Sequence, residues 1–456
     1  MLPKNKTEQK SKGRNFLYPK KPSGKLYTYR KRASYGLLIS LFSAPFLRYK
    51  GEQLVLLNFL ERKFVFFGLI FTPQDFYLFA FATLIFILFV ICFTVVLGRL
   101  WCGWACPQTI FMEMIFRRIE YWIEGDAVRQ KKLDAQSWNA EKFIKKSSKH
   151  FLFILISFAI ANTFLAYLIG SDVLYKIIAE PVGQHISGFI SICIFTAIFY
   201  IVFTYVREVV CAVICPYGRL QGVLLDNQSL IVAYDEKRGE PRGKISKDFK
   251  DSLKGDCVDC GLCVQVCPTG IDIRKGTQLE CVNCTACIDA CDEVMLKLSK
   301  PKRLIGFYNN DYIKDGKPFK AGLKGYGYAV VLFIAVVLFS SLIYKRQNVE
   351  TTVLRASGTL FQTRPDGTVS NLYNAELINK TNKAIYFKFR SENKADSVLF
   401  IQSQKVLPKE GTIHLTFFLI RKSDNINSYK SEVKFEVIAD GEIISTASTS
   451  FFANPK

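Results

Sequence analysis

Eight of the 14 cysteines in this chain lie between residues 257 and 291, in two runs with the same spacing, C-x2-C-x2-C-x3-C. The first run is Cys257, Cys260, Cys263 and Cys267, and the second is Cys281, Cys284, Cys287 and Cys291. This is the ligand pattern of paired [4Fe–4S] clusters in bacterial ferredoxins, because three thiolates spaced by two residues wrap one cubane from a short loop. The pattern therefore predicts one-electron transfer.

The fourth cysteine of each run is expected to bind the cluster of the other run. We predict that one cluster is held by Cys257, Cys260, Cys263 and Cys291, and the other by Cys267, Cys281, Cys284 and Cys287. Two alternatives are a pair of zinc sites and a set of disulfides. Zinc usually separates its C-x-x-C pairs by a longer spacer, and a reducing compartment disfavours disulfides.

The composition is that of a membrane protein with a basic face. Of 456 residues, 50% are hydrophobic and 39 are Phe, yet the formal net charge is +22. Positive charge beside long apolar runs favours a basic cytoplasmic face over a nucleic-acid binder, so we expect no nucleic-acid partner. No signal peptide is recognisable, because the first apolar run begins only after Arg32 and no small-residue cleavage site follows it.

Four apolar stretches reach the length of about 20 residues that a helix needs to span the hydrocarbon core. They are residues 77–97, 151–169, 186–206 and 326–343. A shorter fifth candidate is 35–46, which becomes a span if its ends are extended or if 54–71 helps as an interfacial or re-entrant segment. We therefore predict a multi-domain membrane protein built on an α-helical bundle of about five spans.

The positive-inside rule orients these spans. The N-terminal residues and the loop 99–150 are rich in Lys and Arg, whereas the short loop at 171–185 carries only Lys176. The basic segments and the clustered cysteines are therefore expected in the cytoplasm, and five spans place the C-terminal segment on the opposite side. The predicted parts are a mostly disordered basic tail (1–34), four helices (35–206), a segment with a ferredoxin-like 2[4Fe–4S] domain at about 250–300 (207–324), a fifth helix (325–344) and a C-terminal domain (345–456).

The C-terminal domain shows a β pattern. Alternating runs lie at 384–390, 398–402, 412–421, 430–439 and 443–452. Alternation with regular turn signals over roughly 100 residues predicts an antiparallel immunoglobulin-like β-sandwich. Because the segment has no His, Cys or Met cluster, we interpret it as a structural or protein-contact domain.

A second cysteine system lies where two predicted spans end. Cys102 and Cys106 follow the span 77–97, Cys211 and Cys215 follow the span 186–206, and each pair forms a C-x3-C-P motif. At a spacing of i, i+4 both sulfurs of a pair lie on one helix face, and the proline limits continuation of the helix. Soft thiolates select Cu(I), zinc or iron–sulfur clusters. We expect these four to form a metal or redox site with a catalytic role, because clustered cysteines mark such sites.

Each motif is preceded by an arginine, Arg99 or Arg207. A cation beside a thiol lowers its pKa, so we expect the two arginines to favour the thiolate form. The alternative is that the four cysteines are small hydrophobes buried at helix stops. This alternative is the interpretation that we prefer for Cys92 and Cys193, which lie inside apolar runs.

Together these features resemble the CcoG/FixG (RdxA) family of cytochrome c oxidase accessory proteins. The resemblance is carried by W-C-G-W-A-C-P-Q-T at 101–109, W-I-E-G-D at 122–126, C-P-Y-G-R-L-Q at 215–221 and Y-D-E-K-R-G-E-P-R at 234–242, with the ferredoxin segment, the final span and the β-rich tail. One departure is Asp292, which follows Cys291 in place of a proline. The C-x3-C-P motifs and two clusters alone would also fit quinol-dehydrogenase membrane ferredoxins.

The resemblance implies a multi-pass protein of the bacterial inner membrane with cytoplasmic clusters and a periplasmic immunoglobulin-like domain. It implies two [4Fe–4S] clusters as cofactors, copper as substrate or ligand, and a role in assembling a cbb-type haem–copper oxidase. The protein would then be a cupric reductase that supplies Cu(I) to a copper-exporting ATPase. The alternatives are a quinol-oxidising membrane ferredoxin subunit and a non-enzymatic copper or assembly scaffold. The electron donor is not identified, and a homodimer stays open.

Overall fold

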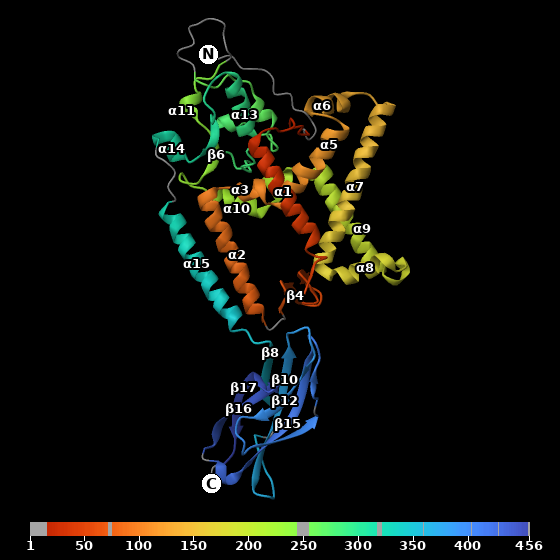
Figure 1. Ribbon diagram of the computed structural model, residues 1–456, viewed down its shortest axis with the longest axis vertical. Helices are drawn as coiled ribbons and strands as arrows, with labels where there is room; N and C mark the ends of the chain where they lie inside the picture. The colour runs from red at the N-terminus through yellow and green to blue at the C-terminus, as the bar shows by residue number, and fades with distance from the viewer. Residues whose placement is uncertain are drawn as a thin grey trace. The chain divides into compact units, whose positions relative to one another are not determined.

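The computed structural model describes residues 16–71, 75–243, 255–316, 322–358, 360–402, 404–426 and 428–454. The chain divides into two compact units, one of Met1–Phe46 with Thr83–Val336 and the other of Leu47–Ala82 with Val337–Lys456. Figure 1 shows the elements of both. All clustered cysteines and both C-x3-C-P motifs belong to the first unit, whereas the β-rich segment belongs to the second.

Within the described residues, four helices are long and apolar enough to span a membrane. They are α2 (Phe76–Leu97), α7 (Ala140–Ile169), α9 (Ile186–Ile201) continued by the π-helical η4 (Val202–Val206), and α15 (Leu323–Tyr344). These are the four long stretches predicted from the sequence. Helix α7 begins earlier than predicted, because the Asn139 side chain caps it by accepting a hydrogen bond from the Lys142 N–H at 2.8 Å.

The predicted disordered tail needs correction, and the short fifth candidate at 35–46 is the end of a longer helix. Residues 16–34 are folded, and α1 (Lys25–Ser43) begins among residues that were assigned to a disordered tail. The reason is a specific anchor: the Asp289 carboxylate accepts hydrogen bonds from the N–H groups of Leu26 and Tyr27, at 3.2 and 2.7 Å. Residues 1–15 lie outside the described residues. Because the first half of α1 is basic, α1 is not among the four apolar helices.

Helix α1 nevertheless runs along the helical bundle for most of its length. At one end Arg30 Nε donates to the carbonyl of Gly103 at 2.7 Å, beyond the end of α2. Towards the other end the Leu41 carbonyl accepts from Tyr167 Oη at 2.8 Å, in the last turn of α7. The stretch 35–46 therefore lies against the bundle as the end of a longer, partly charged helix.

Short helices connect these long ones within the first unit. They are α3 (Leu100–Trp104), α4 (Pro107–Ile110), the π-helical η2 (Phe111–Phe116), α5 (Arg117–Ile123), α6 (Ala127–Ala135), α8 (Ser171–Ala179), η3 (Val182–Gln184), the π-helical η5 (Val210–Ile214) and α10 (Pro216–Leu224). Buried phenylalanines hold η2, α7 and η4 together, with the rings of Phe116 and Phe203 stacked at 4.6 Å and Phe153 edge-on to Phe116 at 4.8 Å.

The ferredoxin-like domain is larger than the predicted segment at about 250–300. It is closed by strand β6 (Ile231–Tyr234), which pairs antiparallel with β7 (Ile305–Tyr308). The remaining elements from residue 236 to residue 315 are α11 (Glu236–Gly239), α12 (Leu262–Gln265), η7 (Ile273–Lys275), α13 (Ala286–Lys297) and α14 (Asn310–Asp315). Its core includes Val232, Ile288 and Met295, each at most 2% exposed. Residues 244–254 lie outside the described residues.

The second unit contains the predicted antiparallel β-sandwich. One sheet has the order β13-β15-β10-β8, with β9 paired to β10, and another has the order β12-β16-β17. The strands are β8 (Val349–Arg355), β9 (Gln362–Thr363), β10 (Thr368–Asn379), β11 (Ile385–Tyr386), β12 (Lys388–Ser391), β13 (Ser397–Gln402), β14 (Val406–Leu407), β15 (Thr412–Lys422), β16 (Lys430–Ala439) and β17 (Glu442–Phe452), with a turn η8 (Ser423–Asn425). The predicted runs coincide with β11 to β13 and β15 to β17, whereas β8 and β10 were not predicted.

The prediction that 54–71 is an interfacial or re-entrant segment is wrong. This part of the second unit forms a β-meander of β3 (Val55–Asn58), β4 (Lys63–Phe66) and β5 (Leu69–Phe71), preceded by the pair β1 (Arg48–Tyr49) and β2 (Glu52–Gln53). Its apolar residues alternate, so that one face forms a small core of Leu56, Val65 and Ile70. Alternation with a period of two is a strand signal, and it was overlooked because the segment is short and apolar.

A fully buried carboxylate ties this meander and the last span to the β-sandwich. Asp75 lies just before α2, and Arg346 lies just after α15. Asp75 accepts hydrogen bonds from Arg346 Nη2 at 2.7 Å and from Lys380 Nζ at 2.6 Å, all within the second unit. Burial alone would raise the pKa of the Asp75 carboxyl, but the hydrogen bonds from Arg346 and Lys380 outweigh it and lower the pKa.

Replacing Asp75 with asparagine is expected to destabilise the second unit by about 3 kcal/mol, because it removes the carboxylate that pairs with buried Arg346 and one of the two carboxylates that pair with Lys380. Calorimetric unfolding should show this loss, and the exposed Asp440→Asn should show almost none. Because the folded pKa of Asp75 is lowered, its stabilisation is fully present above about pH 4 and disappears as the pH falls through the folded value. An unchanged unfolding transition in Asp75→Asn at neutral pH would contradict this account.

Candidate electron-transfer site

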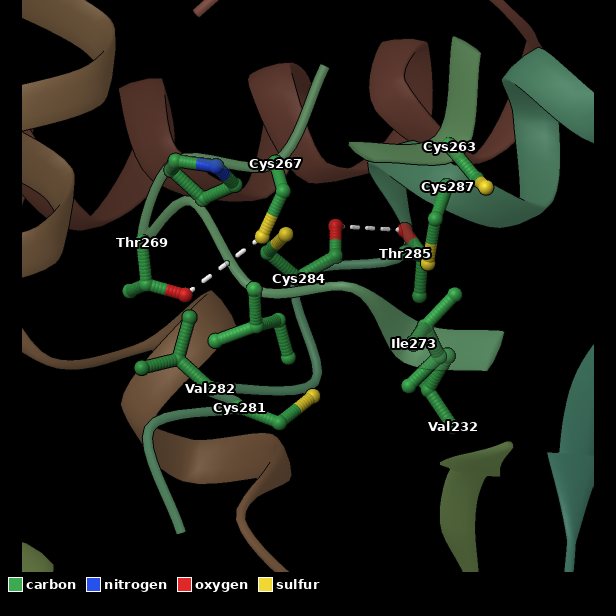
Figure 2. Close-up of a pocket in the computed structure, with 12 residues that line it drawn as sticks. Val232, Cys263, Cys267, Thr269, Ile273, Cys281, Val282, Cys284, Thr285 and Cys287 are labelled. Carbon is green, nitrogen blue, oxygen red and sulfur yellow. Dashed lines mark hydrogen bonds between the residues drawn. The ribbon is translucent and has the colours of Figure 1, made fainter. Parts of the chain in front are cut away.

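The eight clustered cysteines surround two small cavities in the ferredoxin-like domain. One is lined by Cys257, Cys260, Cys263 and Cys291. The other is lined by Cys267, Cys281, Cys284 and Cys287, and Cys263 lines both cavities (Figure 2). This grouping corresponds to the two ligand sets predicted from the spacing. The assignment of each thiol to a cluster stays a prediction, and the lining of the cavities supports it.

The two cysteine runs adopt the same backbone conformation. In each run the residues on both sides of the second cysteine have positive φ: Asp259 at 52° and Gly261 at 67°, then Asn283 at 52° and Thr285 at 67°. Three of these four residues are not glycine, and such residues rarely adopt positive φ. The repeated left-handed turns, each followed directly by α12 or α13, bring successive thiols to one side of the loop.

The chemistry of the cavities fits iron–sulfur clusters. Within the described residues, no group of three or more His, Cys, Asp or Glu side chains is arranged to hold a single metal ion. Burial raises the pKa of Cys281 and Cys291 to about 12 and that of Cys263 and Cys284 to about 11. Thiols with such pKa values are neutral at pH 7, so binding a cluster must release their protons.

The two C-x3-C-P motifs contact each other. Cys102 Sγ donates to Gln221 Oε1 at 2.9 Å, and Gln221 follows Cys215 on α10. In return, Thr109, which follows Cys106, lies with its hydroxyl 4.0 Å from the sulfur of Cys211. Each motif therefore contacts the other through a side chain on the helix after its second cysteine. We call Cys102, Cys106, Cys211 and Cys215 the thiol quartet.

The prolines of the motifs begin helices. Pro107 is the first residue of α4 and Pro216 is the first residue of α10, with Cys106 and Cys215 as the extended residues before them. Proline is favoured at this position because its missing N–H is not needed there. Each motif is thus a helix, a break at the second cysteine and a new helix, which corrects the expectation of one continuous helical face.

The expected effect of the two arginines on the thiols is corrected as well. Burial raises the pKa of Cys102 to about 12 and that of Cys211 to about 11, and Arg99 offsets only part of this rise. Arg207 is not among the main influences on these two thiols, and its guanidinium is paired with Glu120. The structure therefore holds these two buried thiols in the neutral form at pH 7.

The thiol quartet lies directly against the loop that carries the second cysteine run. Gly103, between Cys102 and Cys106, is so close that a Cβ atom there would meet the Val282 carbonyl and lie 3.0 Å from the Cys284 backbone. Cys102 and Cys284 belong to one buried apolar cluster. A residue larger than glycine at position 103 would push the two sites apart, so this glycine permits their close approach.

Several residues around the site were missed by the sequence analysis. Arg30 was assigned to a disordered tail, and Gln221 and Thr109 carried no signal beyond their place in the motifs. Arg117 Nη2 donates to the carbonyl of Pro268 at 2.9 Å, directly after Cys267, and is itself paired with Glu113. The burial of Arg30, one helical turn before the buried Ser34, is seen only in the structure.

Comparison with protein families identifies iron–sulfur domains in both cysteine systems. A family described as a 4Fe-4S dicluster domain matches residues 206–310, and one described as a 4Fe-4S binding domain matches residues 79–133. A third, described as an IG-like fold at the C-terminal of FixG, matches residues 339–454. The iron–sulfur matches include both C-x3-C-P motifs as well as the eight clustered cysteines.

Similar proteins are known from bacteria. The chain is 33% identical to protein RdxB of Cereibacter sphaeroides over 85% of its own length and 84% of that protein. It is 33% identical to protein RdxA of the same organism, over 84% and 83% of the two lengths. Nitrogen fixation protein FixG of Rhizobium meliloti is 35% identical over 64% of this chain and 57% of FixG.

Proposed function

This chain belongs to the family of membrane iron–sulfur electron-transfer proteins that includes FixG, RdxA and RdxB, and we propose that it reduces Cu(II) to Cu(I). The electrons would be stored on the two iron–sulfur clusters that the eight clustered cysteines hold. Copper is reduced and captured at the thiol quartet. The ligand sets of the two clusters are those predicted from the spacing.

The observation that carries this proposal is the contact between Gly103 and Cys284. Through this contact Cys102 of the thiol quartet and Cys284 of the second cavity lie in one buried apolar cluster. An electron held in that cavity therefore has a short, packed route to Cys102. A quartet formed only of small hydrophobic residues at helix stops would have no need of such a contact.

When bound, the [4Fe–4S] clusters supply reversible one-electron storage. The chain's own residues supply the rest. Apolar side chains such as Val232 and Ile273 close the second cavity, while Gln221 and Thr109 position the thiols of Cys102 and Cys211. Each Cu(II) ion takes up one electron, and the electron comes from one reduced iron–sulfur site.

Capture follows from a change in ligand preference. Cu(II) suits nitrogen and oxygen ligands, whereas Cu(I) is selected by thiolates. A pair of thiolates is enough for Cu(I), so the quartet does not need to form a four-coordinate site around one ion. Binding Cu(I) releases the thiol protons of Cys102 and Cys211, and the buried guanidinium of Arg99 beside them favours the anionic product.

The cellular setting is part of the same proposal. The basic loops place the iron–sulfur sites in the cytoplasm, and α1 as a fifth, partly charged crossing would place the β-sandwich in the periplasm. Cu(I) formed there would be handed to a copper-exporting ATPase and used in assembling a cbb-type haem–copper oxidase. In this setting the immunoglobulin-like domain is the part of the chain that contacts the assembly machinery.

An anaerobic titration tests the function. Purified, dithionite-reduced protein freed of excess reductant is titrated with Cu(II), while the iron–sulfur absorbance and Cu(I) bound to a chromogenic chelator are followed together. About one Cu(I) should form per electron lost. If the absorbance is insensitive to Cu(II) but recovers on adding a quinone, the protein is a quinone-linked electron carrier and the proposal is wrong.

A further inference from the structure

Two buried arginines near the second cavity have no carboxylate partner among the described residues. Arg30 is 1% exposed; its Nε donates to the carbonyl of Gly103 at 2.7 Å, and its Nη2 has no partner. Gly103 is packed on Cys284, which lines the second cavity, and the Arg30 guanidinium interacts electrostatically with the Cys284 sulfur.

Arg99 is the second buried arginine without a carboxylate partner among the described residues. It is 3% exposed, and its Nε has no hydrogen-bond partner. A Cβ atom on Gly218 would lie 2.8 Å from its Nη2, so the guanidinium sits between the two C-x3-C-P motifs. It interacts electrostatically with Cys281 of the second cavity and with Cys102.

The other charged groups around the second cavity nearly cancel each other. Arg117, which donates to the carbonyl of Pro268, is paired with Glu113 on the preceding helical turn and approaches Glu208 at 3.5 Å. Arg207 is paired with Glu120. Among the described residues near this cavity, the two arginines without an ion-pair partner are therefore Arg30 and Arg99.

The first cavity has a different environment. Its arginine, Arg274, forms ion pairs with Asp272 at 2.8 Å and with Asp259. Asp292 follows Cys291 directly and is paired with Arg303 at 3.6 Å. Cys260 is exposed to solvent. Every arginine described at this cavity thus has an acidic partner, and no isolated buried cation faces it.

We propose that Arg30 and Arg99 raise the reduction potential of the cluster site at Cys267, Cys281, Cys284 and Cys287 above that of the other site. An electron shared between the two sites then rests on the one that touches the thiol quartet. Reduction adds a negative charge, and a nearby buried cation without a counter-ion stabilises that charge strongly in a low-dielectric interior. Burial works in the opposite direction, so without these arginines the enclosed site would be the harder of the two to reduce.

This assignment deepens the proposed function, because it gives the electron a direction towards Cys102, yet it can be tested without copper. A redox titration of the full chain, monitored by absorbance and electron paramagnetic resonance, should show two reduction steps. In Arg30→Gln the reduction potential of the higher step should fall by at least about 59 mV, which is a tenfold change in the equilibrium constant for one electron. Arg99→Gln should lower the same step.

Three further variants separate the charge effect from a structural one. Arg30→Lys keeps the charge, so the potential of its higher step should stay close to that of the parent chain. Arg32→Gln, an exposed arginine on the same helix, should move neither step. Arg274→Gln should move only the step at lower potential, because Arg274 lines the first cavity. Iron content is measured in each variant, so that loss of a cluster is not mistaken for a shift.

The outcomes are distinct. The inference is overturned if Arg30→Gln and Arg99→Gln keep their iron and leave the higher step unchanged, or if they shift only the lower step. If Arg30→Gln loses iron, the test rests on the other two variants. The inference is then overturned if Arg99→Gln keeps its iron and leaves the higher step unchanged, or if Arg30→Lys keeps its iron and shifts only the lower step. Failure of copper reduction with the potentials as expected would instead contradict the proposed function and leave this assignment standing.

Discussion

Replacing Cys284 with serine is expected to remove one of the two clusters and with it about half of the iron, from about eight to about four atoms per chain. A serine oxygen is a poor substitute for a thiolate, and Cys284 is a buried thiol on the wall of the second cavity. Cys260→Ser should remove the other cluster in the same way. Iron and sulfide analysis with the visible absorbance measures both losses.

The matched control is Cys102→Ser, in which a buried thiol of the adjacent quartet is changed. It should keep about eight iron atoms, because the quartet is not assigned to either cluster. Loss of half of the iron in Cys102→Ser would make that residue a cluster ligand. The ligand sets proposed for the two cavities would then be wrong.

The second large effect is expected at the thiol quartet. When Cys102, Cys106, Cys211 and Cys215 are all changed to alanine, the rate of Cu(I) formation by reduced protein should fall by at least about tenfold, which is about 1.4 kcal/mol in the barrier. The thiolates stabilise Cu(I), so removing them weakens both the capture of copper and the driving force for reducing it. Stopped-flow absorbance after mixing with Cu(II) gives the rate.

The chain offers a control with the same chemistry. Cys92 on α2 and Cys193 on α9 are thiols outside the site, and changing both to alanine should leave the rate unchanged. The quartet variant should still hold its iron and be reduced by dithionite, which separates a loss of transfer from a loss of the clusters. Copper reduction at the parental rate in the iron-loaded quartet variant would show that copper is reduced elsewhere.

Local patterns in the sequence predicted most of the elements. The spacing of the eight cysteines, the four long apolar stretches and the alternation in β15 to β17 are local signals, because each arises from neighbouring residues and one kind of element. The segment at Leu56, Val65 and Ile70 was assigned wrongly, since a short apolar stretch fits a strand and a membrane-interface segment equally well. The first half of α1 was assigned to a disordered tail, because its basic residues show no apolar pattern that would indicate packing.

The electrostatics of the site could not be predicted in the same way. A sequence shows an arginine before each C-x3-C-P motif, but only the fold shows that Arg207 is neutralised by Glu120 whereas Arg99 is not. Likewise, burial outweighs the effect of Arg99 on Cys102, and burial is a property of the packed structure. The contact of Gly103 with Cys284 joins residues far apart in the chain, and no spacing rule predicts it.

The central claim is that one electron reaches copper and that the product is held by the thiol quartet. The most direct measurement is a copper K-edge X-ray absorption spectrum of reduced protein after one equivalent of Cu(II). The account predicts Cu(I) with sulfur ligands in the parent chain and loss of those sulfur ligands when the four quartet cysteines are changed to alanine. Copper that remains Cu(II), or Cu(I) with the same sulfur ligands in both proteins, would contradict it.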